Sequence, residues 1–135
     1  MMTRRIHSGR GSAGGQALVE FALILPVILL LVVGVLEFAR AWNLHQVMTD
    51  AAREGARRAV LADPVIDRDS VKAAMWRHLA AFGYDPAFAT MTIAPDADFK
   101  DHGKNITITL SLPYRFAILP GKDLTMKSIF TMRNE

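Results

Sequence analysis

The residue types most often used in catalysis are scattered along this chain. The four histidines stand far apart and in none of the spacings of metal ligands, such as HExxH: they are His7, His45, His78 and His102. No serine lies in a nucleophile elbow, and no glycine-rich phosphate loop follows a candidate strand. The chain has no cysteine, which excludes a thiolate metal site and a cysteine nucleophile. The sequence therefore predicts a protein that is not an enzyme, with no cofactor, no bound metal and no small-molecule substrate.

Three aspartates gather shortly before Gly103. Asp96, Asp98 and Asp101 have a spacing similar to that of a calcium-binding loop. The glycine and the distal glutamate that complete an EF-hand loop are not at the required positions. We interpret this cluster as a solvated turn.

Glu20 is the acidic residue whose position most needs an explanation, because it stands inside an apolar stretch. A carboxylate in an apolar membrane span is costly and normally has a partner. The alternative is that Glu20 lies at the edge of a bilayer and simply reaches the headgroups. The sequence leaves both interpretations open at this point.

The element that would position Glu20 is the apolar segment Ala17–Leu36. No charged residue occurs from Phe21 to Leu36, and a helix of this length rises about 30 Å, the thickness of a bilayer core. A secretory signal peptide is the alternative, but its apolar core has about 7–15 residues and ends at a small-residue cleavage site. Here the run is longer and the following residues continue a helical pattern. We therefore predict a transmembrane segment at residues 16–36.

The positive charge of the chain is confined to its N-terminus. Residues 1–15 carry Arg4, Arg5 and Arg10 and no acid, whereas the rest carries 16 − 3 = 13 basic and 13 acidic residues. Arginines before an apolar span hold that end in the cytoplasm, which predicts an extracytoplasmic location for residues 37–135. No basic stripe with interleaved aromatics occurs, so nucleic acid is not an expected partner. The glycine-rich residues 1–15 show no periodicity, and we expect them to lack regular structure.

Two features of the predicted helix admit two interpretations each. Pro26 removes a backbone hydrogen bond and should kink or loosen the span, either as a flexible point for extraction from the membrane or as a tolerated membrane proline. Further along lies a flat strip of small side chains that packs either on the protein's own sheet, which we favour, or on another subunit. The strip consists of Ala52, Gly55, Ala56 and Ala59.

The predicted fold is α+β. One long helix runs from about Ala17 to Ala62, first apolar and then amphipathic, with ion pairs at Glu37/Arg40, Asp50/Arg53 and Glu54/Arg58, and Asp63-Pro64 ends it. A second helix follows at Val71–Phe82, capped by Asp69 or Ser70, with Phe82 in its buried stripe and Gly83 in the left-handed position after it. Strands are expected at Thr90–Ala94, Asn105–Tyr114 and Leu124–Met132. They form a small antiparallel sheet of three or more strands that packs on the long helix.

The residues GQALVEF at positions 15–21 resemble the prepilin-peptidase site of type IV pilins. A cut between Gly15 and Gln16 would make Glu20 the fifth residue of the mature chain. The continuation VEFALILPVILLLVVGVLEFARA, and then TDAAREGARRA, resembles the TadE-like minor pilins, or pseudopilins, of the Flp (tight-adherence) pilus system. The resemblance is strong over Gly15–Val60 and loose over the remainder.

This resemblance implies a minor pilin for assembly of a Flp-type (type IVb) pilus, which acts by helix packing. A prepilin peptidase would remove residues 1–15 as a leader, and the new amine at Gln16 would pair with Glu20 of a neighbouring subunit. An unpaired charge in such an apolar core costs several kcal/mol, so the pair would set the axial register. The implied partners are the prepilin peptidase, other minor and major pilins, the inner-membrane assembly platform and the lipid bilayer. The implied location is the bacterial inner membrane, as a single-pass protein, and the assembled pilus.

Two alternatives remain. The first is an uncleaved single-span membrane scaffold of the pilus or secretion machinery. It shares nearly every sequence feature and differs only in whether the Gly15–Gln16 bond is cut. The second is a secreted binding module that has lost its leader and span, which would place the mature N-terminus beyond Ala39.

Overall fold

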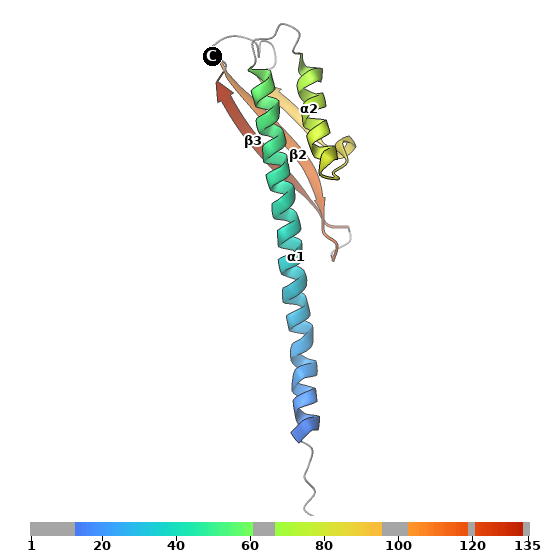
Figure 1. Cartoon of the computed structure of the whole chain (residues 1–135). Helices are drawn as coiled ribbons and strands as arrows, with labels where there is room; N and C mark the ends of the chain where they lie inside the picture. Colours follow the sequence, from blue (N-terminus) through green and yellow to red (C-terminus); the bar gives the residue numbers. More distant parts are fainter. Residues whose placement is uncertain (1–12, 61–66, 96–102, 119–120, 134–135) are drawn as a thin grey trace, which may run out of the picture. The chain divides into compact units, whose positions relative to one another are not determined.

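The computed structural model describes residues 13–60, 67–95, 103–118 and 121–133 (Figure 1). It divides the chain into two compact units, Met1–Leu36 and Glu37–Glu135. The fold is α+β, as predicted: a long N-terminal helix, a shorter second helix and a three-stranded antiparallel sheet.

The first helix, α1, extends over Ala13–Ala59 and belongs to both units. It begins before the predicted start at Ala17, so the expectation that the leader residues Ala13–Gly15 lack regular structure is wrong. Extending an existing helix adds one hydrogen bond for each residue ordered, which makes such an extension cheap even for glycine. Arg57 and Arg58 in the last turn complement the negative end of the helix dipole. The predicted stop at Asp63-Pro64 lies outside the described residues.

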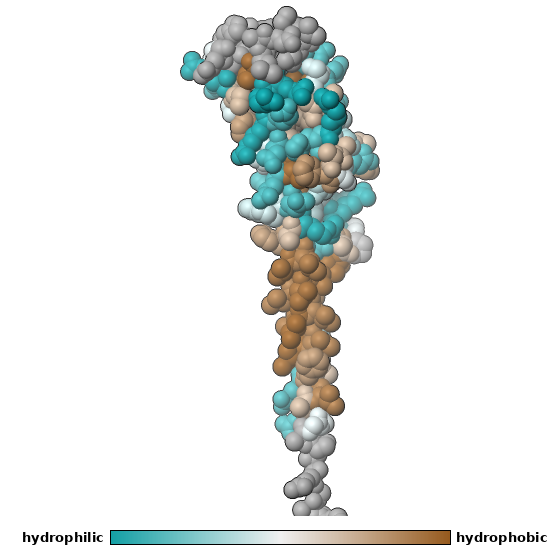
Figure 2. Space-filling view, viewed as in Figure 1, coloured by the Kyte–Doolittle hydropathy of each residue, from teal (hydrophilic) through white to brown (hydrophobic). Residues whose placement is uncertain are grey.

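The first unit shows apolar side chains all around α1. None of residues 14–36 is buried, and Figure 2 shows this part of α1 as a hydrophobic band. The helix is long and apolar enough to cross a membrane. A helix that is apolar on every side has no polar face to present to water, which is consistent with a single-pass membrane protein.

The second helix, α2, extends over Arg68–Ala81, and its cap is Asp67 rather than the predicted Asp69 or Ser70. Asp67 has an extended backbone and accepts a hydrogen bond from the backbone N–H of Ser70 at 2.8 Å. Ser70 instead occupies the third helical position and accepts from the backbone N–H of Asp67 at 3.2 Å, which completes a capping box. The capping box thus moves the helix start upstream of the predicted residues.

The end of α2 differs from the prediction at one side chain. Val71, Met75 and Leu79 are buried, but Phe82 is exposed because it is the C-cap, where the chain leaves the helix. Gly83 has a φ of 80°, which confirms the predicted left-handed position. A short 3-10 helix, η1 (Pro86–Phe88), then leads to the sheet and was not predicted.

The sheet has the order β1–β2–β3 and is antiparallel throughout. Its strands are β1 (Thr90–Ala94), β2 (Asn105–Arg115) and β3 (Asp123–Arg133), so the three predicted strands are confirmed. The strict alternation along the central strand β2 is also confirmed, with one set of side chains fully or almost fully buried: Ile106, Ile108, Leu110 and Leu112.

The core of the second unit lies between the C-terminal half of α1, α2 and the sheet. Leu44, Met48 and Ala51 of α1 belong to one buried cluster with the apolar side chains of β2 and with Met75 of α2. A polar contact supplements this packing, since the hydroxyls of Thr49 on α1 and Ser128 on β3 lie 3.2 Å apart. The expectation that the long helix covers the sheet is therefore confirmed, as Figure 1 also shows.

Candidate assembly site

The predicted cleavage and register residues occupy the first turns of α1. Gly15, Gln16 and Glu20 are all helical, and the Nε2 group of Gln16 donates a hydrogen bond to Oε1 of Glu20 at 3.3 Å. Residues four apart lie on one helix face, so this contact follows from the spacing alone. Both side chains are exposed. Glu20 is thus available to a group from outside this helix.

The bond between Gly15 and Gln16 lies close to the N-terminal end of α1. The first four backbone N–H groups of a helix have no partner within the helix, so this end unwinds at little cost. A bond at this position can be presented to a protease in an extended form more cheaply than one in the helix interior.

Pro26 lies inside α1 and does not end it, because the residues on both sides are helical. The predicted kink or loosening at this position remains a prediction.

The strip of small side chains lies in the core of the second unit. Ala52, Gly55, Ala56 and Ala59 are all buried by the protein's own chain. A Cβ atom added to Gly55 would lie 2.6 Å from Sδ and 2.8 Å from Cγ of Met75, and 3.1 Å from Cδ1 of Ile108. These contacts show that α1 approaches α2 and the sheet closely at Gly55, and they leave this strip no surface for another subunit.

We expect Gly55→Ala to lower the free energy of unfolding by about 1 kcal/mol. Alanine gains about 1 kcal/mol in helix propensity, but overpacking a core typically costs about 1–3 kcal/mol. Unfolding of the full chain in detergent micelles can be followed by fluorescence of Trp42 and Trp76, which both belong to the second unit. The loss should shrink in a Met75→Ala background, where the clash is removed. A Gly55→Ala variant more stable than the wild type would contradict this prediction.

Glu37, the first residue after the apolar segment, has a role that the sequence analysis missed. The prediction gave it only an ion pair with Arg40, which is present at 2.9 Å. Its carboxylate also accepts hydrogen bonds from the hydroxyl of Tyr114 and from the backbone N–H of Ala117 at 3.0 Å. The same hydroxyl lies 3.1 Å from the backbone oxygen of Glu37. These contacts join the start of the second unit's helix to the end of β2, and we call them the Glu37 latch.

The Glu37 latch is buried and polar. Only 8% of the Glu37 surface and 4% of the Tyr114 surface is exposed. Burial, and the hydrogen bond to the Glu37 carboxylate, raise the pKa of the Tyr114 hydroxyl, so Tyr114 stays a donor at neutral pH. A signal for this role was present in the sequence, because Glu37 shares the helical spacing of Ala41, Leu44 and Met48 on the core face.

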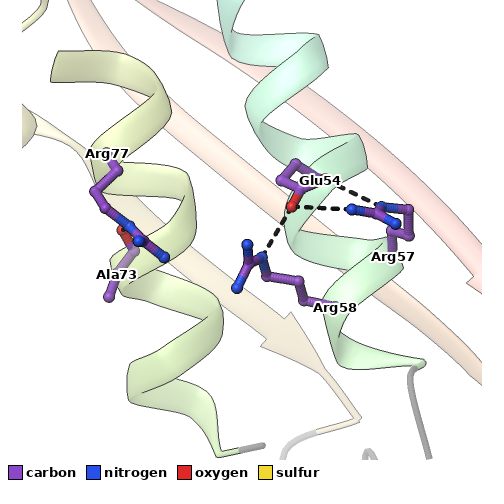
Figure 3. A network of polar contacts seen from close by, with 5 residues as sticks. All are labelled: Glu54, Arg57, Arg58, Ala73 and Arg77. Carbon is purple, nitrogen blue, oxygen red and sulfur yellow. Dashed lines mark hydrogen bonds and ion pairs between the residues drawn. The ribbon is translucent and has the colours of Figure 1, made fainter. Parts of the chain in front are cut away.

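A second charged cluster lies on the surface of α1 (Figure 3). The carboxylate of Glu54 accepts from Arg58 at 2.8 Å, as predicted, and also from Arg57 at 3.1 Å. The predicted pair of Asp50 and Arg53 is present at 3.4 Å. Such pairs on a helix surface contribute only a few tenths of a kcal/mol each and favour the helix.

The residues considered for metal binding are not brought together where the structure describes them. His45 is exposed on α1, and His78 on α2 is half-buried beside Phe82. Within the described ranges, no three histidine, cysteine, aspartate or glutamate side chains are grouped to hold a metal ion. The other candidates lie outside the described residues, namely His7, His102, Asp96, Asp98 and Asp101.

The fold and the apolar helix together define a class: α+β proteins with one N-terminal helix that can cross a membrane. A family model described as TadE-like protein matches residues 15–57, which confirms the predicted resemblance over this segment. The match shows what this segment is similar to and leaves α2 and the sheet outside it. Comparison with curated proteins and with solved structures found no match.

Proposed function

We propose that this protein is a minor pilin, or pseudopilin, which a prepilin peptidase processes after Gly15 and which acts in assembly of a Flp-type pilus by helix packing. One observation carries the proposal. The TadE-like match begins at residue 15, at the bond where a cut would make Glu20 the fifth residue of an exposed apolar helix. The matched segment thus contains Gln16, Glu20 and the whole exposed apolar helix.

The exposed helix supplies the means of assembly. Leu23, Leu30 and Leu31 are each about two-thirds or more exposed, at 71%, 70% and 66%, so this surface must be covered by lipid or by other helices. Other minor and major pilins would provide such helices, with the inner-membrane assembly platform feeding the protein from the bilayer. Glu20 would pair with the amine that cleavage creates at Gln16 of a neighbour, and this pair would set the register.

The second unit supports a minor or priming role. Its sheet and second helix add a globular body to the helix, and such a body in every subunit would interrupt dense helix packing. The proposed location is the bacterial inner membrane, with the N-terminus in the cytoplasm and residues 37–135 outside it. We propose no catalytic role for the protein, which is itself a substrate of the peptidase.

The test is the N-terminal residue of the protein recovered from native membranes, determined by intact mass and N-terminal peptide mapping. We expect a start at Gln16 that is lost when the peptidase is deleted or when Gly15→Ala is introduced. Gly14→Ala is the matched control and should leave processing intact, because Gly14 is helical and has open space around it.

Other outcomes would overturn the proposal. A start at Met1 or Met2 while pili are being assembled would favour the uncleaved membrane scaffold. A start beyond Ala39 would favour a secreted module.

A further inference from the structure

The end of the second unit that adjoins the apolar segment is built from two parts of the chain. Glu37 follows Leu36 directly, and the Glu37 latch holds Tyr114 and Ala117 beside it. Leu124 of β3 is the register partner of Tyr114, and Ile118 follows Ala117 in the chain. The end of the β2–β3 hairpin therefore lies at the level of the first residue after the apolar segment.

Large apolar side chains are exposed at this same level. Phe38 is 68% and Trp42 55% exposed on α1, and Ile118 is 48% and Leu124 53% exposed on the hairpin. The rings of Phe38 and Trp42 stack on each other with centroids 6.1 Å apart, and neither belongs to the core cluster. We call these four side chains the apolar collar. Four such side chains in contact with water would be unfavourable, since apolar surface is more stable in an apolar environment than in water.

The collar matches the depth of a membrane interface. Helical rise places Phe38 about 1.5 Å and Trp42 about 7.5 Å beyond Glu37 along α1. The headgroup layer on each side of the hydrocarbon core is about 5–8 Å thick, and tryptophan is enriched in it. If residues up to Leu36 lie in hydrocarbon, Phe38 lies within the headgroup layer. Trp42 lies about 9 Å beyond Leu36 and reaches the outer edge of this layer, because helical side chains lean toward the helix N-terminus.

The charges around the collar also suit this layer. The charged residues here are three basic and two acidic, so the local charge is 3 − 2 = +1. They are Arg40, Arg115 and Lys122, and Glu37 and Asp123. The side chains of Arg40 and Arg115 are 55% and 72% exposed, and Lys122 is exposed as well. Long basic side chains near an apolar surface extend their charged ends toward phosphates. The small excess of charge means that apolar insertion, more than charge, would hold the collar in place.

From these observations we infer that the apolar collar docks into the headgroup layer of the bilayer that holds residues 17–36, so that the β2–β3 hairpin end rests on the membrane. This inference depends on the membrane location within the proposed function. Its consequence is that the second unit has a defined orientation on the bilayer before assembly, and that the collar must leave the lipid when the protein enters a filament.

The natural absence of cysteine allows a direct test. Single variants Leu29→Cys, Ile118→Cys and Ile129→Cys of the full chain would each carry a nitroxide label, in vesicles of phosphatidylethanolamine and phosphatidylglycerol at low protein density. Ile129 is the matched control, because it is 58% exposed and lies in the interior of β3, away from the hairpin end. Relaxation by oxygen reports contact with lipid, and relaxation by a water-soluble nickel chelate reports contact with water.

The inference predicts that the label at position 118 has more contact with oxygen and less with the chelate than the label at position 129, and that its preference lies between those at positions 29 and 129. A label at 118 with the same preference as the label at 129, while the label at 29 favours oxygen, would overturn the docking and leave the membrane span intact. A label at 29 that favours the chelate would overturn the membrane location itself. A label at 118 accessible to neither reagent would also overturn the docking, since it would indicate contact with protein.

Discussion

Replacing Tyr114 with phenylalanine is expected to lower the free energy of unfolding of the full chain by about 1.5–3 kcal/mol, the usual contribution of a hydrogen bond to a charged group. The hydroxyl donates to a carboxylate that is almost fully buried, so water cannot replace it without opening the core. The Glu37 carboxylate keeps Arg40 and the Ala117 N–H, which limits the loss. Fluorescence-detected unfolding in detergent micelles would measure the change.

Tyr84→Phe provides the matched control for this prediction. The Tyr84 hydroxyl accepts from Nδ2 of Asn43 on α1 at 3.1 Å, but this contact is exposed to solvent. The same substitution there should change stability by less than about 0.5 kcal/mol, because water replaces the lost partner. A double-mutant cycle of Tyr114→Phe with Glu37→Gln should show coupling between the two sites. Equal effects at Tyr114 and Tyr84, without coupling to Glu37, would contradict the latch as a source of stability.

The second large effect is expected for Glu20→Gln, which should abolish pilus assembly without preventing cleavage after Gly15. Glutamine has nearly the same shape and can still accept the hydrogen bond from Gln16, so the substitution removes the charge and little else. In an apolar filament core, the new amine of a neighbour would then be left without a counter-charge, at a cost of several kcal/mol. Surface pili and the mature N-terminus of the retained protein would be measured in the same cells.

Glu20→Asp is the control for this prediction, because it keeps the charge and shortens the side chain. It should retain more assembly than Glu20→Gln if charge pairing sets the register. Normal assembly in Glu20→Gln would instead support the interpretation in which Glu20 only reaches the headgroups at the bilayer edge.

Much of this fold was predictable because its signals are local. The apolar helix follows from an uninterrupted run of apolar residues, and the central strand follows from the alternation of Ile106, Ile108 and Leu110 with polar residues. The ion pairs along α1 follow from a spacing of three or four residues. In each case, residues close together in the sequence determine the outcome.

The structural details that the prediction missed depend on residues that meet only after folding or on exact backbone geometry. Asp67 caps α2 because its backbone is extended and its carboxylate reaches the N–H of Ser70. Asp69 is also a favourable N-cap residue, so residue type alone did not distinguish the two. The spacing of Glu37 and Arg40 predicted their ion pair. The other two partners of Glu37, Tyr114 and Ala117, are 77 and 80 residues away along the chain, so no local pattern indicated them.

The sequence by itself determined the membrane-compatible helix, the α+β class and the position of Glu20 relative to Gly15, because each of these depends on local composition, periodicity or spacing. Only the tertiary structure decided that the strip around Gly55 is buried within the protein, since close approach to Met75 and Ile108 is a contact between distant segments. The tertiary structure also decided that Glu37 joins the helix to the hairpin. A buried carboxylate needs several donors, and the chain supplies them from β2 and the residues just beyond it.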